Sequence, residues 1–167
     1  DDHIDKDLTF RLNKLLPKEI AVRNIIPVTQ DAHARFDAVS RSYRYNLTTQ
    51  KNPFLQKRSY HFTKPIDVEL MNQAAKILID HKDFKCFSKS KTDVKTYICD
   101  IQHAHWQQDG SELVFFIQAN RFLRNMVRAI VGTLIEVGLR KISISRISIL
   151  YSMNHIHYSF RFWMLSV

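Results

Sequence analysis

Residues 96 to 138 decide the fold of this chain, and they read TYICDIQHAHWQQDGSELVFFIQANRFLRNMVRAIVGTLIEVG. Apolar and polar side chains alternate over residues 96–106 and again over residues 113–117, a pattern typical of β-strands. Asp109 and Gly110 between them suit a tight turn. The two runs are therefore predicted to pair as a β-hairpin.

A helical repeat follows the hairpin directly. Between residues 121 and 137, apolar side chains recur every three or four positions and form one continuous stripe. Asn120 is the predicted N-cap, and Gly138 is the predicted left-handed residue that ends the helix. Gly132 in the interior costs about 1 kcal/mol relative to Ala, so we expect another backbone to approach it closely.

Four further elements are predicted on the N-terminal side of this stretch. Helical spacing of apolar residues predicts helices over residues 8–16, which Asp7 would cap and Pro17 would end, and over residues 67–80. β-branched and aromatic runs predict strands over residues 20–28 and 42–47. The sequence therefore predicts the α+β class, with a mostly antiparallel sheet covered by helices.

Length and composition exclude several classes of protein. The chain has 167 residues, of which 45% are hydrophobic and 25% charged, enough for one packed domain and unlike a disordered chain. No apolar run approaches the roughly 18 residues of a membrane helix, and the opening residues are acidic where a signal peptide is basic. Cys86 and Cys99 are expected to be reduced, unpaired thiols. Because the first residue is not Met, we expect a preceding segment.

The charge distribution points towards a polyanionic partner. Lys and Arg number 25 against 16 acidic residues, which gives a net charge of +9 and a pI of about 9.7. Basic residues cluster between His33 and Lys64, and no acidic residue follows Glu136. Clustered basic residues can bind nucleic acid or form an ordinary solvated face, and charge alone leaves both readings open.

Two local patterns sharpen the nucleic-acid interpretation. Arg121, Arg124 and Arg128 have the spacing of one helix edge, which could follow phosphates or simply face solvent. Arg128 lies near the apolar stripe, where a guanidinium needs an anionic or carbonyl partner. Tyr43, between Arg41 and Arg44, is suited to stack on an unstacked base, although a place in the core is the alternative.

Metal and nucleotide cofactors find little support. His103 and His105, like His155 and His157, are two apart and would share a strand face, but carboxylates are sparse around them and Asp100 would face the other way. We therefore predict no metal site and keep a metal-binding domain as an alternative. The chain has only 3 glycines and no glycine-rich phosphate loop, so no nucleotide cofactor is expected.

Four segments of the chain carry a resemblance to one protein family, in the same order. The run HARFDA at residues 33–38, followed by Arg41, Tyr43, Arg44 and Tyr45, is similar to the HARF…RxYRY motif of the bacterial tRNA pseudouridine synthase A family. The other segments are residues 12–22, 83–89 and 120–138, so the resemblance covers about residues 8 to 141.

The resemblance implies an incomplete pseudouridine synthase-like fold and a cytoplasmic homodimer. It implies isomerisation of uridine to pseudouridine in the anticodon stem-loop of tRNA, without metal or cofactor. Tyr43 resembles the tyrosine that stacks on the target base, and Arg128 resembles the arginine that pairs with the catalytic aspartate. We expect tRNA to be bound by Tyr43 together with five arginines, Arg35, Arg41, Arg44, Arg121 and Arg124.

The chain departs from the family pattern at both ends. The nucleophilic aspartate of the family lies in a GRTDxGVHA-like segment upstream of the part that residues 12–22 resemble, and Asp37, Asp93 and Asp100 are in no such motif. We therefore assign no catalytic nucleophile in this chain. From about residue 144 the sequence stops matching, which suggests truncation or a shifted reading frame.

The expected domains follow from this resemblance. Residues 1–28 would end the N-terminal subdomain, residues 29–143 would form the C-terminal subdomain, and residues 144–167 would be an aberrant tail. A non-catalytic basic RNA-binding module remains the alternative function.

Overall fold

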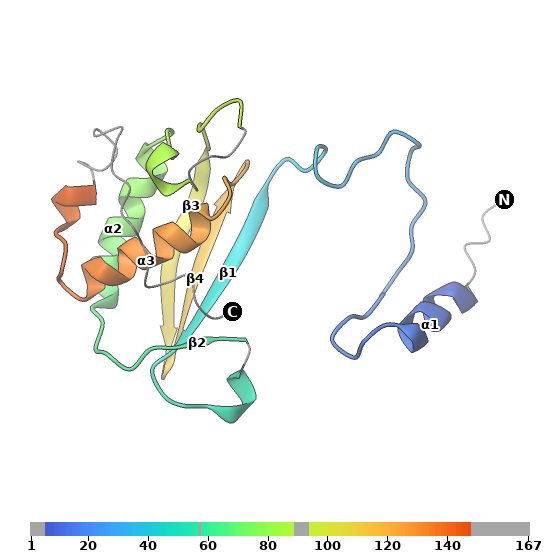
Figure 1. The fold of residues 1–167 in the computed structure, drawn as a ribbon, viewed down its shortest axis with the longest axis horizontal. Coiled ribbons are helices and arrows are strands. Elements are labelled where there is room, and N and C mark those ends of the chain that lie inside the picture. The colour runs from blue at the N-terminus through green and yellow to red at the C-terminus, as the bar shows by residue number, and fades with distance from the viewer. Residues whose placement is uncertain (1–5, 57, 89–93, 148–167) are drawn as a thin grey trace. The chain divides into compact units, whose positions relative to one another are not determined.

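The computed structural model describes residues 6–56, 58–88 and 94–147 (Figure 1). The chain divides into two compact units, Asp1–Ala38 and Val39–Val167. Within the described residues, no helix has the length and apolar character needed to cross a bilayer. The subdomain boundary expected at residue 28 comes from the resemblance and stays a prediction.

The first unit contains the predicted helix but not the predicted strand. Helix α1 spans Lys6–Leu15, which confirms the helix expected before Pro17, but Asp7 lies within the helix, so its predicted role as the cap is wrong. The strand expected over residues 20–28 is wrong, since none of the described strands includes these residues. The side-chain amide of Asn13 donates to the Val22 carbonyl at 2.7 Å and accepts from the Val22 N–H at 2.7 Å. A side chain thus takes both backbone groups that a neighbouring strand would bind.

The second unit is built on a four-stranded sheet. Its strands are β1 (Arg41–Thr48), β2 (Tyr60–His61), β3 (Ile101–Asp109) and β4 (Glu112–Ala119), in the order β2-β1-β4-β3. β4 pairs antiparallel with both β1 and β3, and β1 pairs parallel with β2. The predicted hairpin is confirmed, although β3 begins at Ile101 and not at residue 96. The mixture of this sheet with helices confirms the α+β class.

Two helices pack on one face of the sheet (Figure 1). Helix α2 spans Val68–Asp80, as predicted, and Asp67 caps it by accepting from the Leu70 N–H at 3.1 Å. This bond, and then the Arg140 guanidinium, hold the pKa of Asp67 below its ordinary value. Helix α3 spans Met126–Gly138. The short 3-10 turns Pro53–Leu55 (η1) and Lys85–Phe87 (η2) lie in connecting segments, and residues 144–147 are helical.

Every second side chain along the strands points towards the helices. Leu47 on β1, Trp106 on β3 and Phe115 on β4 are buried, and so are Met71 on α2 and Ile130 on α3. Residues two apart on a strand share a face, so the intervening side chains lie on the opposite side of the sheet. The core therefore lies between one sheet face and the two helices.

Helix α3 begins later than the sequence predicts. The expected start at residue 121 and the expected N-cap Asn120 are wrong, because the helix starts at Met126 after Asn125, whose backbone is left-handed (φ 70°). Leu123 is nevertheless buried, with 5% of its surface exposed. The apolar repeat therefore began with buried residues of a non-helical turn, and these residues could not be told apart from those of the helix that follows.

Gly138 also has a role other than the predicted one. It lies within α3, and Arg140 is the described residue near the helix end that takes a left-handed conformation (φ 58°). A Cβ added to Gly138 would stand 2.6 Å from the sulfur of Met71 and would also overlap Ile66. Gly138 is thus needed for close packing against α2 and its leading residues. The close approach expected at Gly132 stays a prediction.

The expected tail falls almost entirely outside the described residues. Of residues 144–167, only 144–147 are described, and Ile147 is fully buried against the core. The expectation of a truncated or frame-shifted end therefore stays a prediction.

Candidate functional site

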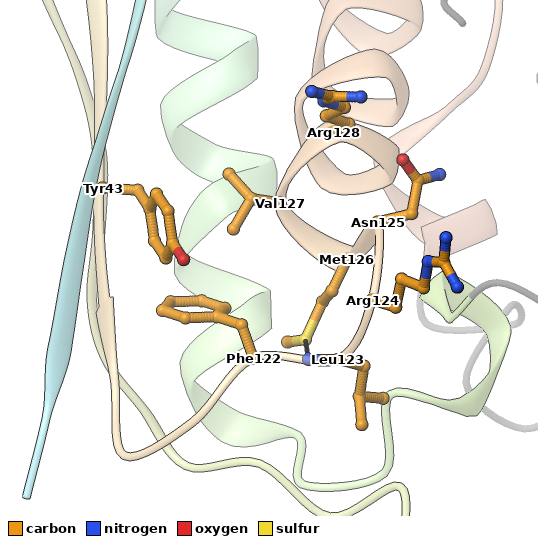
Figure 2. A pocket seen from close by; sticks show the side chains of 8 residues that line it. All are labelled: Tyr43, Phe122, Leu123, Arg124, Asn125, Met126, Val127 and Arg128. Carbon is orange, nitrogen blue, oxygen red and sulfur yellow. Dashed lines mark hydrogen bonds between the residues drawn. The ribbon is translucent and has the colours of Figure 1, made fainter. Parts of the chain in front are cut away.

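A pocket of about 350 Å³ opens at the N-terminal end of α3 (Figure 2). One wall is Tyr43 on β1, and the rest comes from the turn after β4 and the first turn of α3. Its described lining is Tyr43, Phe122, Leu123, Arg124, Asn125, Met126, Val127 and Arg128. Segments that lie about 80 residues apart in the sequence thus build one site.

Tyr43 presents its ring to this pocket. It points to the same side of β1 as the buried Leu47, yet 50% of its surface is exposed because it lies near the start of the strand. The Phe122 ring meets it edge to face, with ring centroids 5.2 Å apart and planes at 84°. Tyr43 is therefore not a core residue, and the alternative of core packing is wrong. Its exposed surface is available to a planar ligand.

The turn before α3 is held by its own backbone. The Met126 N–H donates to the Leu123 carbonyl at 3.1 Å, and the Leu123 N–H donates to the Met126 sulfur at 3.5 Å. Met126 is fully buried, so this closure is anchored in the core. The turn consequently exposes Arg124 while it buries the apolar residues on either side.

The three arginines predicted to share a helix edge do not do so. Arg121 and Arg124 precede the helix, and Arg128 lies in its first turn. The structure instead brings Arg124 and Arg128 together with Tyr43 at the pocket, where both arginines are exposed. Arg128 is therefore not desolvated, and the expectation that it needs a partner to offset burial is wrong.

The charge of Arg128 reaches the strand beside it. Burial raises the pKa of the half-buried Tyr45 phenol above its ordinary value, and the Arg128 guanidinium opposes that rise. A similar effect operates at Arg121: burial raises the pKa of the Cys99 thiol, and the Arg121 charge lowers it. Each of these two arginines thus opposes the effect of burial on the pKa of a neighbouring group.

The other predicted binding arginines of the second unit are not among the residues that line the pocket. Arg44 faces the opposite side of the sheet, with its guanidinium carbon 5.1 Å from the centre of the Phe116 ring. Arg41 donates from Nη1 to the Asn120 carbonyl at 2.6 Å. Arg35 belongs to the first unit, where it lies over the Phe36 ring at 5.7 Å.

Sequence reasoning missed Phe122 as a partner of Tyr43. The apolar repeat assigned Phe122 to the buried stripe of the helix, where it would have covered the core. Its position three residues after the end of β4, the strand that pairs with β1, is the signal that could have placed it beside Tyr43.

No acidic side chain lines the described part of the pocket. Asp37 accepts from the His33 N–H at 2.6 Å, Asp100 pairs with Lys82, and Asp93 lies outside the described residues.

The predicted histidine pairs show no gathering of ligands where they are described. His103 lies opposite Gln118, and the His105 ring stacks on Phe116 with centroids 5.1 Å apart. Over residues 6–56, 58–88 and 94–147, no three His, Cys, Asp or Glu side chains gather as a metal site would require. His155 and His157 lie outside these ranges.

Comparison with known proteins identifies the family. The family model described as tRNA pseudouridine synthase matches residues 74–158. The chain belongs to the tRNA pseudouridine synthase family. It is 57% identical over 141 residues to tRNA pseudouridine synthase A of Parabacteroides distasonis, covering 83% of this chain and 56% of the relative.

Other relatives agree. The chain is 55% identical over 142 residues to tRNA pseudouridine synthase A of Bacteroides fragilis, covering 84% of this chain and 56% of that protein. With the Bacillus subtilis protein of the same name the identity is 41% over 136 residues, covering 80% of this chain and 55% of the relative. The chain thus spans a little over half the length of these curated relatives, and the resemblance drawn from its motifs is confirmed.

Proposed function

We propose that the complete protein isomerises uridine to pseudouridine in tRNA, and that this chain supplies the part that holds the target nucleotide. The observation that carries the proposal is the pocket that joins the half-exposed Tyr43 ring to the exposed Arg124 and Arg128. An aromatic surface beside guanidinium groups suits a base that has left its stack and the phosphates next to it. Family membership supports this reading of the pocket.

Within this proposal each side chain has a distinct role. The Tyr43 ring stacks on the extruded uracil, and Phe122 braces that ring from its edge. Arg124 binds a neighbouring phosphate. Arg128 pairs with an aspartate carboxylate from outside the 167 residues, because a nearby cation keeps such a group ionised and nucleophilic. With the carboxylate as nucleophile, the bond between C1′ and N1 of uridine breaks and the base turns. C5 then bonds to C1′ as the carboxylate leaves, C5 loses its hydrogen to water, and N1 takes up a proton.

The remaining basic residues are proposed to position the RNA. Arg35, Arg41, Arg44 and Arg121 contribute to the net charge of +9, which favours association with a polyanion. We propose the anticodon stem-loop as the region bound. Contacts of this type locate a ligand without reading its sequence, so the choice of uridine would follow from tRNA shape.

We further propose that the complete protein is a cytoplasmic homodimer. The motif resemblance described above supports the dimer, and sedimentation of the complete protein tests it.

Turnover of tRNA labelled with tritium at uracil C5 tests the proposed reaction, because forming the carbon–carbon bond releases that hydrogen to water. The chain alone is expected to release no tritium. The chain mixed with the N-terminal part of the Parabacteroides distasonis relative is expected to restore release. Release by the chain alone would show that the nucleophile lies within it. Failure of the mixture, with tRNA still bound, would favour the non-catalytic RNA-binding module.

A further inference from the structure

The turn that forms most of the pocket leaves the sheet at Asn120. The last paired residue of β4 is Ala119, which lies opposite Arg41 on β1 and opposite Ile101 on β3. Asn120 is thus the first residue beyond the ladder, and Phe122 follows two positions later. Whatever fixes Asn120 also sets the direction in which the pocket turn begins.

Asn120 is tied to both neighbouring segments. Its N–H donates to the Asp100 carbonyl at 3.1 Å, and its Oδ1 accepts from the Asp100 N–H at 2.8 Å. Its own carbonyl accepts from Arg41 Nη1 at 2.6 Å. The Asp100 carboxylate is paired in turn with the Lys82 ammonium group. Three hydrogen-bonding groups of one exposed residue therefore bind the segments on either side of β4.

These bonds connect the two rings of the pocket. Arg41 precedes Tyr43 by two residues on β1, and Asn120 precedes Phe122 by two residues. The bond from Arg41 to Asn120 therefore joins the two chain segments whose rings meet edge to face at 5.2 Å. At its other end the turn is closed by the bonds between Leu123 and Met126. The segment that carries Phe122 is thus anchored on both sides.

We propose that Arg41 and Asn120 are positioning residues, which hold the Tyr43 and Phe122 rings at their spacing before RNA arrives. A binding site works best when supporting groups fix its contact residues in advance. This role rests on the proposed function of the pocket, but it concerns the free protein. It differs from the predicted phosphate contact of Arg41, which would operate only with RNA bound.

The methyl resonance of Met126 in the RNA-free protein tests the proposal. Met126 lines the pocket and its sulfur accepts from Leu123, whereas Met71 is buried on α2 beside Gly138 and reports on the rest of the core. With methionine methyl groups labelled, Arg41→Ala is expected to shift the Met126 resonance and to leave that of Met71 in place. Arg41→Lys, which keeps a donor, is expected to restore much of the original position.

Three further variants complete the test, with Arg44→Ala as the control. Arg44→Ala removes a guanidinium from the same strand but on the opposite sheet face, and it is expected to shift neither methyl resonance. Asn120→Ala removes the acceptor for the Asp100 N–H and should shift Met126, whereas Asn120→Asp keeps an oxygen there and should shift it less.

Several results would overturn the proposal. An unchanged Met126 resonance in Arg41→Ala would do so, and so would equal shifts at Met126 and Met71, which would indicate a general loss of packing. If Arg41→Ala shifts no methyl group but lowers the salt dependence of tRNA binding, Arg41 is a phosphate contact instead. Because the resonances are recorded without RNA, a Met126 shift in a protein that fails to bind tRNA would contradict only the proposed function.

Discussion

Replacing Tyr43 by Ala probes the pocket most simply. A tyrosine side chain offers about 150 to 250 Å², and the exposed half of Tyr43 leaves about 75 to 125 Å² for a base to cover. At about 25 cal/mol per Å², complete coverage gives about 2 to 3 kcal/mol. A base covers only part of that area, which agrees with the range of about 1 to 3 kcal/mol for stacking on an aromatic residue.

The expected loss of tRNA affinity is therefore about 5-fold to 150-fold for Tyr43→Ala. Tyr43→Phe keeps the ring and should bind nearly as well as the original chain. Fluorescence anisotropy with a labelled anticodon stem-loop at fixed salt measures both. Phe54→Ala is the matched control, since Phe54 is 90% exposed and does not line the pocket, and it should leave the affinity unchanged.

Stability must be followed in the same samples. Loss of the edge contact with Phe122 should lower the free energy of unfolding by about 0.5 to 1.5 kcal/mol. If Tyr43→Ala remains folded and binds the stem-loop as tightly as the original chain does, the ring holds no base and the reasoning is refuted.

Three other predictions concern packing and ionisation. Gly138→Ala should lower the free energy of unfolding in urea by about 1 to 3 kcal/mol, since its new methyl overlaps Met71, and an unchanged midpoint would contradict this packing. Arg128→Ala should raise the pKa of Tyr45 further, because it removes the charge that opposes the effect of burial. A ¹³C titration of tyrosine Cζ measures this pKa, and an unchanged pKa would show that the Arg128 charge does not act on Tyr45. Burial raises the pKa of Cys86 to about 11, so the rate of its alkylation in the folded chain should increase from pH 8 up to about pH 11. A rate that stops increasing by pH 9 would contradict this pKa.

The strand β1, the hairpin of β3 and β4, and the helix α2 were predictable because their signals are local, whereas the two-residue β2 was not predicted. Alternation along residues 42–47 placed Tyr43, Tyr45 and Leu47 on one face, and the apolar repeat over residues 67–80 indicated α2. The structure confirms both, as well as the hairpin around Gly110. Each of these signals depends on neighbours in the sequence and not on a distant partner.

The start of α3 and the segment at residues 20–28 depend on distant contacts. Phe122 and Leu123 fit a helical repeat, but the left-handed backbone of Asn125 separates them from the helix, and periodicity alone does not show this. Residues 20–28 have strand composition, yet a strand also needs a neighbour, and Asn13 takes the backbone groups of Val22 instead.

The candidate site was predictable in part. Tyr43, Arg124 and Arg128 were named from the sequence and line one pocket. Their arrangement was not predictable, because the arginines were expected along a helix edge and Phe122 was assigned to the core. Pairing of β1 with β4 brings these groups together, and register between strands 70 residues apart leaves no local signal in one sequence.

Photo-crosslinking tests the central claim most directly. A tRNA carrying 4-thiouridine at the target position is irradiated with the chain, and the crosslinked peptides are identified by mass spectrometry. The account predicts crosslinks to the peptide that contains Tyr43 and to residues 122–128, reduced in Tyr43→Ala. Crosslinks confined to the opposite sheet face, around Arg44 and Phe116, would contradict the placement of the target uridine in this pocket.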